Sequence, residues 1–220
     1  METLRRTGVS EKCCPACGAH EPEPCSRAAG LSACRSCQTV FVEDRPVEEE
    51  ILRKYRATEE RSDTMQPEVS GKTVNDYRVI CDWIRRMTET TPVVMDLGCG
   101  HGAFLSAARK EGFRHLVGVE VKPSNIAYAR TKRNLEILEF SQIRNYAGPR
   151  VNALVSMQVL EHLSDPLAVL SACLPLTAGD AVFIFQVPDM RKFVYDPGHL
   201  TYFSVAGLTA LVRRAGLEPR

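Results

Sequence analysis

The stretch VVMDLGCGHGAFL, residues 93–105, decides the fold of this 220-residue chain. A short apolar run ends at Asp96 and leads into a turn that contains Gly98, Gly100 and Gly102. Glycine is needed where a backbone bends sharply and lets a ligand approach without a Cβ in the way. A helical pattern follows the turn, and the N-terminus of a helix offers free N–H groups that suit a carboxylate or a phosphate. The stretch therefore predicts a ligand-binding turn between a buried strand and a helix.

Apolar runs alternate with helical patterns from Pro92 onward, which is typical of a parallel α/β sheet. We expect strands at 93–97, 116–121, 135–139, 153–157 and 181–187, and helices at 103–111, 123–132, 166–173 and 204–215. These elements predict a Rossmann-like, doubly wound, mainly parallel sheet. Two further helices, 48–57 and 74–87, are expected before it, on either side of a polar break at 61–73, with Trp83 buried by packing.

The second strand ends at an acidic residue, Glu120, twenty-two residues after Gly98. An acid at this place can accept hydrogen bonds from both hydroxyls of a ribose. A ligand with a ribose and an anionic group is therefore expected. Two ligands fit, because Gly98-x-Gly100-x-x-Ala103 also satisfies the loose fingerprint of NAD-binding proteins.

Four segments together resemble the class I S-adenosylmethionine-dependent methyltransferases. The pattern Asp96-x-Gly98-x-Gly100-x-Gly102 resembles the family's first motif, and the strand that ends at Glu120 resembles the second. Residues 152–170 and 198–218 resemble the later segments of ubiquinone-pathway O-methyltransferases and deoxysugar C-methyltransferases. The resemblance implies S-adenosylmethionine as cofactor, with eight contacts: Asp96, Gly98, Gly100, His101, Gly102, Glu120, Val121 and Gln158.

The same resemblance implies in-line methyl transfer to a small molecule such as a sugar nucleotide or a natural-product intermediate. Glu161, His162 and His199 are the expected catalytic residues, with His162 as the general base. The alternative for His162 is that it braces the helix that follows. Some ubiquinone-type relatives hold a divalent ion with E-x-x-E-H, and Gln158 replaces the first acid here, which argues against a catalytic metal.

Relatives of this type continue past the last helix with two more strands, which would cover the strand at 181–187. We therefore expect C-terminal strands to be missing and that apolar strand to form an exposed edge. A homodimer through this edge is the expected partner interaction.

Six of the nine cysteines lie in the first forty residues. Cys14-Pro-Ala-Cys17 and Cys34-Arg-Ser-Cys37 form two C-x-x-C pairs separated by sixteen residues, a spacing in the zinc-ribbon range. Four protein ligands predict a structural Zn²⁺, and the alternative is an unmetallated or disulfide-bonded loop. We expect a zinc-ribbon module at 1–46, a helical linker or lid at 47–91 and the S-adenosylmethionine-binding domain at 92–220.

The net charge is +1, from 28 basic and 27 acidic residues, which disfavours a nucleic-acid partner. No apolar run approaches the ~20 residues of a membrane helix, and METLRRTGVSEK has no apolar segment of a signal peptide, so a cytoplasmic protein without a membrane partner is expected. Two alternatives to a small-molecule methyltransferase stay open. The first is an rRNA or tRNA methyltransferase that grips RNA with its ribbon, and the second is a non-catalytic protein that binds partners through the ribbon.

Overall fold

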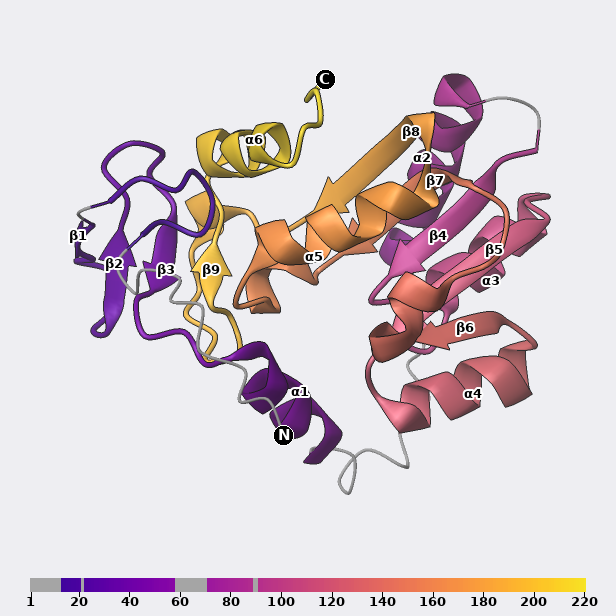
Figure 1. The fold of residues 1–220 in the computed structure, drawn as a ribbon, viewed down its shortest axis with the longest axis horizontal. Helices are drawn as coiled ribbons and strands as arrows, with labels where there is room; N and C mark the ends of the chain where they lie inside the picture. Colours follow the sequence, from indigo (N-terminus) through magenta and orange to yellow (C-terminus); the bar gives the residue numbers. More distant parts are fainter. Residues whose placement is uncertain (1–12, 21, 58–70, 89–90) are drawn as a thin grey trace, which may run out of the picture. The chain divides into compact units, whose positions relative to one another are not determined.

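The computed structural model describes residues 13–20, 22–57, 71–88 and 91–220, so most of the predicted polar break and the first twelve residues lie outside it. The chain divides into two compact units. The ribbon unit comprises residues 1–48, 160–169 and 188–220, and the sheet unit comprises 49–159 and 170–187 (Figure 1). The boundaries expected from the sequence assign each domain one continuous stretch of chain. The ribbon unit instead consists of three stretches that are separated in the sequence.

The sheet unit contains five parallel strands in the order β6-β5-β4-β7-β8. Their bounds are β4 Val93–Leu97, β5 His115–Glu120, β6 Glu136–Glu139, β7 Val151–Met157 and β8 Thr177–Gln186. β4, the first of these strands in the sequence, lies at the centre of the sheet. The chain adds β5 and β6 on one side of it and then β7 and β8 on the other, so the predicted doubly wound parallel sheet is confirmed. β8 begins four residues earlier than expected and lies at an edge of the sheet.

The helices before β9 have the bounds α1 Glu48–Ala57, α2 Gly71–Met87, α3 Ala103–Lys110, α4 Pro123–Arg133 and α5 Pro166–Cys173. Short 3₁₀ helices lie at η2 Phe140–Asn145, η3 Leu160–His162, η4 Leu174–Leu176 and η5 Met190–Lys192. Pro123 opens α4, where its fixed φ suits the first helical position.

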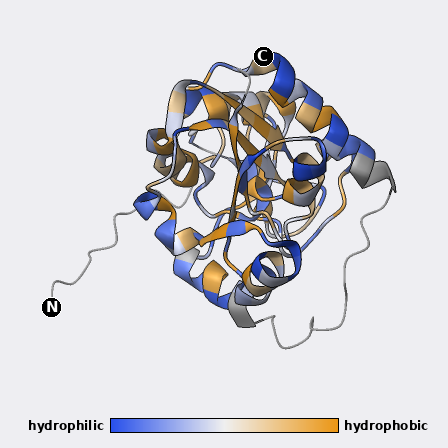
Figure 2. Ribbon diagram, turned by 90° about the vertical axis from the view of Figure 1, so that its right-hand side faces the viewer, coloured by the Kyte–Doolittle hydropathy of each residue, from blue (hydrophilic) through white to orange (hydrophobic). Residues whose placement is uncertain are grey.

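One hydrophobic core joins α2, α3 and α4 to the sheet. Ile84 of α2, Phe104 of α3 and Ala129 of α4 are almost fully buried against Val94 of the central strand. Every residue of β4 is buried, as expected for a central strand with both faces covered. Figure 2 shows helices banded with hydrophilic and hydrophobic residues, the pattern of helices with one face turned to a core. The prediction for Trp83 was wrong, because its side chain is 49% exposed.

The ribbon unit contains a four-stranded antiparallel sheet in the order β1-β2-β3-β9. Its strands are β1 Glu23–Pro24, β2 Leu31–Ala33, β3 Val40–Val42 and β9 Thr201–Tyr202. The last helix, α6 Val205–Arg214, follows β9 directly. The Ser204 side chain accepts a hydrogen bond from the amide of Gly207, so Ser204 is the N-cap of α6. Gly216 has a φ of 80° after the helix end, as a stop glycine should.

None of the described helices has the length and apolar character that crossing a membrane requires.

Candidate functional site

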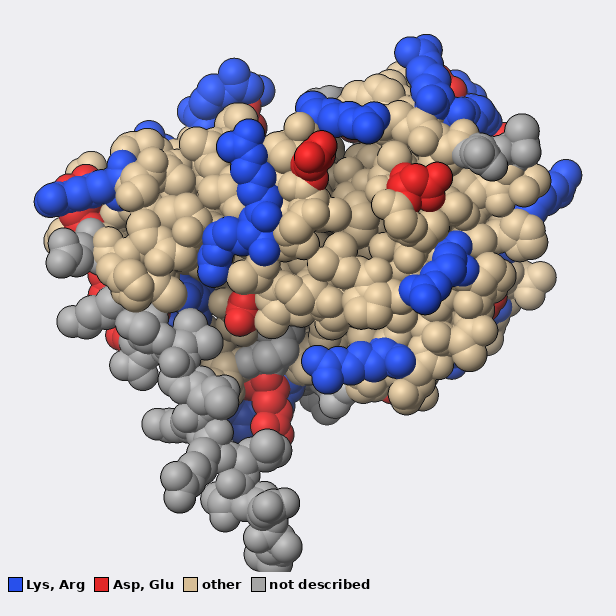
Figure 3. All heavy atoms as spheres, turned by 45° about the horizontal axis from the view of Figure 1, so that its top comes forward, with Lys and Arg blue, Asp and Glu red and all other residues tan. Residues whose placement is uncertain are grey.

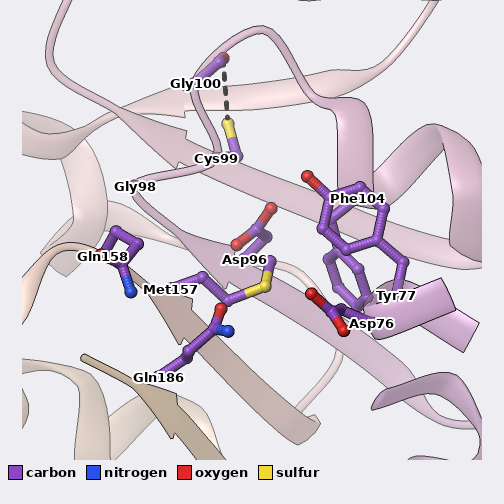
Figure 4. A pocket seen from close by; sticks show the side chains of 10 residues that line it. All are labelled: Asp76, Tyr77, Asp96, Gly98, Cys99, Gly100, Phe104, Met157, Gln158 and Gln186. Atoms are coloured by element: carbon purple, nitrogen blue, oxygen red, sulfur yellow. Dashed lines mark hydrogen bonds between the residues drawn. The ribbon is translucent and has the colours of Figure 1, made fainter. Parts of the chain in front are cut away.

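A pocket of about 340 Å³ opens in the sheet unit at the carboxyl ends of β4, β7 and β8. Its lining residues are Asp76, Tyr77, Asp96, Gly98, Cys99, Gly100, Phe104, Met157, Gln158 and Gln186. In Figure 4 Asp96 lies in the middle of the lining, with the glycine turn on one side and the side chains of Asp76 and Tyr77 on the other. The volume falls in the range of small-molecule sites, and this end of an open parallel sheet is where such ligands bind.

The turn after β4 needs its glycines for two physical reasons. Gly98, Gly100 and Gly102 have φ values of 77°, 54° and 75°, a backbone conformation that residues with a side chain rarely adopt. A Cβ on Gly98 would also collide with the side chain of Val159, and one on Gly102 with that of Leu135. Nothing lies within 4 Å of a Cβ built on Gly100, so that side of the turn is open toward the pocket.

Two carboxylates lie at the ends of neighbouring strands. Asp96 is 2% exposed, and burial, with a smaller effect of Glu120, raises its pKa to about 8. Oε1 of Glu120 accepts hydrogen bonds from the amides of Val121 (2.7 Å) and Lys122 (3.0 Å). These bonds hold the carboxylate at the end of β5 and leave Oε2 to accept from a ligand. Glu120 thus lies at the carboxyl end of β5, next to β4, and is not among the residues that line the pocket.

His101 and Gln158, two other expected cofactor contacts, differ in their surroundings. The His101 ring packs edge-on against Tyr128, with centroids 5.1 Å apart, and partial burial lowers its pKa. Gln158 has a φ of 56°, and its backbone N–H donates a hydrogen bond to the backbone carbonyl of Gln186 at 2.8 Å. Positive φ is a strained backbone conformation for a residue other than glycine, and residues with such strain cluster at binding sites. Gln158 lines the pocket, whereas His101, Gly102 and Val121, like Glu120, are outside its lining.

Six lining residues were not among the expected cofactor contacts: Asp76, Tyr77, Cys99, Phe104, Met157 and Gln186. Tyr77 and Phe104 pack edge to face, with ring centroids 5.6 Å apart. The sequence left two roles open for Tyr77, packing on its helix or contact with the cofactor or acceptor, and favoured packing; the structure shows the residue both packed against Phe104 and lining the pocket. Gln186 could have been found, since it ends the last strand at the edge where ligands of such sheets bind.

The three expected catalytic residues form a separate cluster in the ribbon unit. Glu161 and His162 belong to η3, and His199 precedes β9. One carboxylate oxygen of Glu161 and one ring nitrogen of each histidine all lie within 4.8 Å of one another. The two histidine rings meet edge to face with centroids 4.8 Å apart. Nδ1 of His162 lies 2.8 Å from the carbonyl oxygen of Gly198, which fixes the ring. The structure thus brings all three together, although His199 lies far from the other two in sequence.

The cluster holds polar atoms that other described residues leave unsatisfied. Both carboxylate oxygens of Glu161 and Nδ1 of His199 are buried without a hydrogen-bond partner among the described residues. Burial raises the pKa of Glu161 to about 7 and lowers the pKa of His199. Unsatisfied buried polar groups are costly and are concentrated at ligand sites.

The four cysteines of the two C-x-x-C pairs converge in the ribbon unit. Sγ of Cys14 lies 3.6 Å from Sγ of Cys37, and Sγ of Cys17 lies 3.5 Å from Sγ of Cys34. These separations exceed the ~2.05 Å of a disulfide bond and are close to the ~3.8 Å between sulfurs on one tetrahedral Zn²⁺. Hydrogen bonding from the Cys14 thiol lowers the pKa of Cys37 and raises that of Cys14. The donor set and its spacing fit a structural zinc ion.

Comparisons with known proteins give one family. The sequence profile of a methyltransferase domain family matches residues 73–220. A ubiquinone biosynthesis O-methyltransferase of Cereibacter sphaeroides is 34% identical over 87 residues, 36% of this chain and 34% of that protein. A probable S-adenosylmethionine-dependent methyltransferase of Mycolicibacterium smegmatis is 27% identical over 57% of this chain and 51% of its own length.

Among solved structures, the magnesium protoporphyrin IX methyltransferase of Synechocystis PCC 6803, with bound S-adenosylhomocysteine, shares the fold. Its TM-score is 0.56 at 15% sequence identity, covering 79% of this chain and 91% of that one. The chain spans about a third to a half of the two curated relatives named above.

Proposed function

Because this chain belongs to the methyltransferase domain family, we propose that it binds S-adenosylmethionine and transfers its methyl group to a small molecule. One observation carries the proposal: the glycine turn and Glu120 meet at the carboxyl edge of a parallel sheet that also lines a pocket.

The charge of the pocket supports this cofactor over NAD. The charged residues among its lining, Asp76 and Asp96, are both acidic. S-adenosylmethionine carries a sulfonium and an ammonium group, whereas NAD carries two anionic phosphates. The negative charge of Asp76 stabilises the former and repels the latter, and a bound cation would also favour ionisation of Asp96, whose pKa burial raises to about 8. The cofactor supplies the methyl group, Glu120 accepts from the ribose hydroxyls, and the N–H groups at the start of α3 face the turn.

We assign the acceptor chemistry to Glu161, His162 and His199. With Nδ1 directed at the Gly198 carbonyl, a neutral His162 keeps Nε2 as proton acceptor, the form that a general base requires. His199 is the second candidate, and burial lowers its pKa, which favours the neutral imidazole. A small-molecule acceptor is proposed by analogy with the ubiquinone biosynthesis O-methyltransferase. A sugar nucleotide or natural-product intermediate is proposed from the sequence resemblance to deoxysugar C-methyltransferases.

We also propose that Cys14, Cys17, Cys34 and Cys37 hold a structural Zn²⁺. Four thiolates saturate a tetrahedral ion, so it offers no open position for substrate.

Isothermal titration calorimetry with S-adenosylmethionine and with NAD tests the cofactor. We expect micromolar binding of S-adenosylmethionine alone, weakened about fivefold or more, roughly 1 kcal/mol, by Glu120→Ala. Glu136→Ala, which removes an exposed acid at the start of β6, is the matched control and should bind normally. Binding of NAD, or equal effects of both substitutions, would refute the assignment.

The base is tested by S-adenosylhomocysteine formation with a panel of hydroxylated and aminated small molecules. For an accepted substrate, His162→Gln should lower kcat about 10²- to 10⁴-fold while leaving cofactor affinity unchanged. His115→Gln, at an exposed position of β5, should have no effect. An unchanged kcat in His162→Gln would remove this residue from the mechanism.

A further inference from the structure

The four-cysteine centre is connected to the catalytic cluster through hydrogen bonds that stay within the ribbon unit. β3 begins three residues after Cys37 and pairs with β9, with Val40 opposite Tyr202 and Phe41 opposite Thr201. Just beyond this pairing, the amide of Val42 donates to the Leu200 carbonyl at 3.0 Å. The amide of Leu200 donates in turn to the carbonyl of Glu161 at 2.7 Å. The strand after the second cysteine pair thus holds the backbone beside His199 and that of Glu161.

A second connection runs through α6. The Ser204 hydroxyl, which caps this helix, also donates to the carbonyl of Cys37. At the other end of the helix, Nη1 of Arg214 donates to the carbonyls of Ala16 (2.9 Å) and Pro15 (3.3 Å) in the first cysteine pair. The helix approaches so closely that a Cβ on Gly207 would collide with Thr39. Both cysteine pairs are therefore fixed to the segment that carries β9.

Arg45 makes a third connection. Its guanidinium donates to the carbonyl of Val42 at 3.2 Å and to that of Ser164 at 3.1 Å, two residues beyond His162. The same group lies over the ring of Phe41, 5.6 Å from its centroid. Arg45 thereby ties the end of β3 to the backbone after η3.

We propose that the zinc-bound cysteine centre positions Glu161, His162 and His199, through β3 and α6, for the methyl transfer proposed above. Metal binding at such a site contributes free energy of folding to the loops that carry the ligands. Here the segment around Cys37 and β3 is hydrogen-bonded to Leu200 and to Ser204. These two bonds fix the backbone of the segment that carries His199. The zinc centre is then a determinant of catalysis, whereas the cofactor pocket lies wholly in the sheet unit.

Hydrogen exchange on the full chain tests the connection directly, with and without removal of zinc by a chelator. The amides of Leu200 and Val42 should exchange at least about tenfold faster without zinc, and the amides of β4 and β7 should keep their rates. The side-chain NMR signals of His162 and His199 should shift at the same time. Unchanged protection of Leu200, with zinc loss verified by metal analysis, would overturn the proposal.

Removal of zinc could unfold the whole ribbon unit, so two substitutions test the links with zinc still bound. Ser204→Ala should shift the NMR signals of His199 and lower kcat about five- to tenfold, at unchanged zinc content and unchanged KM for S-adenosylmethionine. Ser204→Thr, which keeps the hydroxyl, should restore both. Arg214→Ala should resemble Ser204→Ala, and Arg213→Ala, at an exposed neighbouring position, should match the unmodified chain.

The two proposals fail in different ways. If the chain does not bind S-adenosylmethionine, the proposed function fails, and the exchange and NMR results still test the connection. If Ser204→Ala and Arg214→Ala leave the histidine signals in place, or if they weaken cofactor affinity as much as turnover, the positioning role is refuted.

Discussion

Gly98 and Gly100 occupy the same turn and have the same backbone constraint, but their surroundings differ. Both have positive φ, while a Cβ would collide with Val159 at Gly98 and would meet nothing within 4 Å at Gly100. The pattern of glycines could be predicted from the sequence because it reflects local backbone geometry. The collision could not, since it depends on a residue that follows β7.

This difference predicts unequal effects of alanine at the two positions. Gly100→Ala should lower the free energy of unfolding by about 1–2 kcal/mol, through positive φ alone. Gly98→Ala should cost about 1–3 kcal/mol more, because Val159 must also move. Denaturant unfolding of both variants measures this, and equal losses would show that Val159 shifts freely.

The buried carboxyl of Glu161 makes stability depend on pH. Its pKa is raised from 4.5 to about 7, so the folded chain keeps a proton that the unfolded chain releases. The stabilisation from the neutral carboxyl is complete below about pH 4.5 and is lost as pH rises through about 7. Relative to Glu161→Gln, the unmodified chain should lose up to about 3 kcal/mol of unfolding free energy across this range.

Unfolding curves at several pH values, with Glu218→Gln at an exposed position as control, check this expectation. A constant difference between the unmodified chain and Glu161→Gln would show that Glu161 is ionised throughout.

At the scale of elements, strands and helices with a strong local pattern were predicted closely. The bounds of β4 and α1 match the prediction residue for residue, because apolar runs and helical spacing are local signals. β9 was missed, since two residues that join a distant sheet carry no pattern of their own. Trp83 was wrongly placed in the core, because its spacing on α2 cannot tell which face turns inward.

The open edge of β8 carries the prediction of a dimer. Within the described residues, β8 pairs with β7 alone, and Phe183 and Phe185 lie on it with ring centroids 6.2 Å apart. We propose that β8 strands of two copies pair along this edge. Sedimentation should show a dimer at about 10–100 µM that Phe183→Lys dissociates, because an edge lysine opposes strand pairing. A monomeric unmodified chain over this range would contradict the proposal.

At the scale of the whole molecule, the balance of charge bears on RNA as a substrate. The chain has 28 basic and 27 acidic residues, and Figure 3 shows Asp and Glu as well as Lys and Arg on the face that it draws. RNA binding requires neutralisation of several phosphates by one basic surface. We therefore expect no retention of structured RNA on filters at about 150 mM salt. Tight binding that falls about 10³-fold or more between 50 and 200 mM salt would favour the RNA methyltransferase instead.

The whole-molecule organisation was the part least accessible from sequence. The C-x-x-C spacing predicted a ribbon at 1–46, and the structure completes its sheet with residues that follow the last strand of the other sheet. Glu161, His162 and His199 could be named individually from the resemblance, but their assembly depends on the pairing of β3 with β9, which is a long-range contact.

That pairing has a consequence during protein synthesis. Cys37 and Ser204, which hydrogen-bond in the finished fold, are 167 residues apart in sequence. At ~5–20 residues per second, the ribosome makes the second of them on the order of ten seconds or more after the first. Through that interval the nascent chain has all four thiols for the metal, and β3 can pair with β2 but not yet with β9. We expect this open edge of β3 to be a point at which molecular chaperones engage the growing chain.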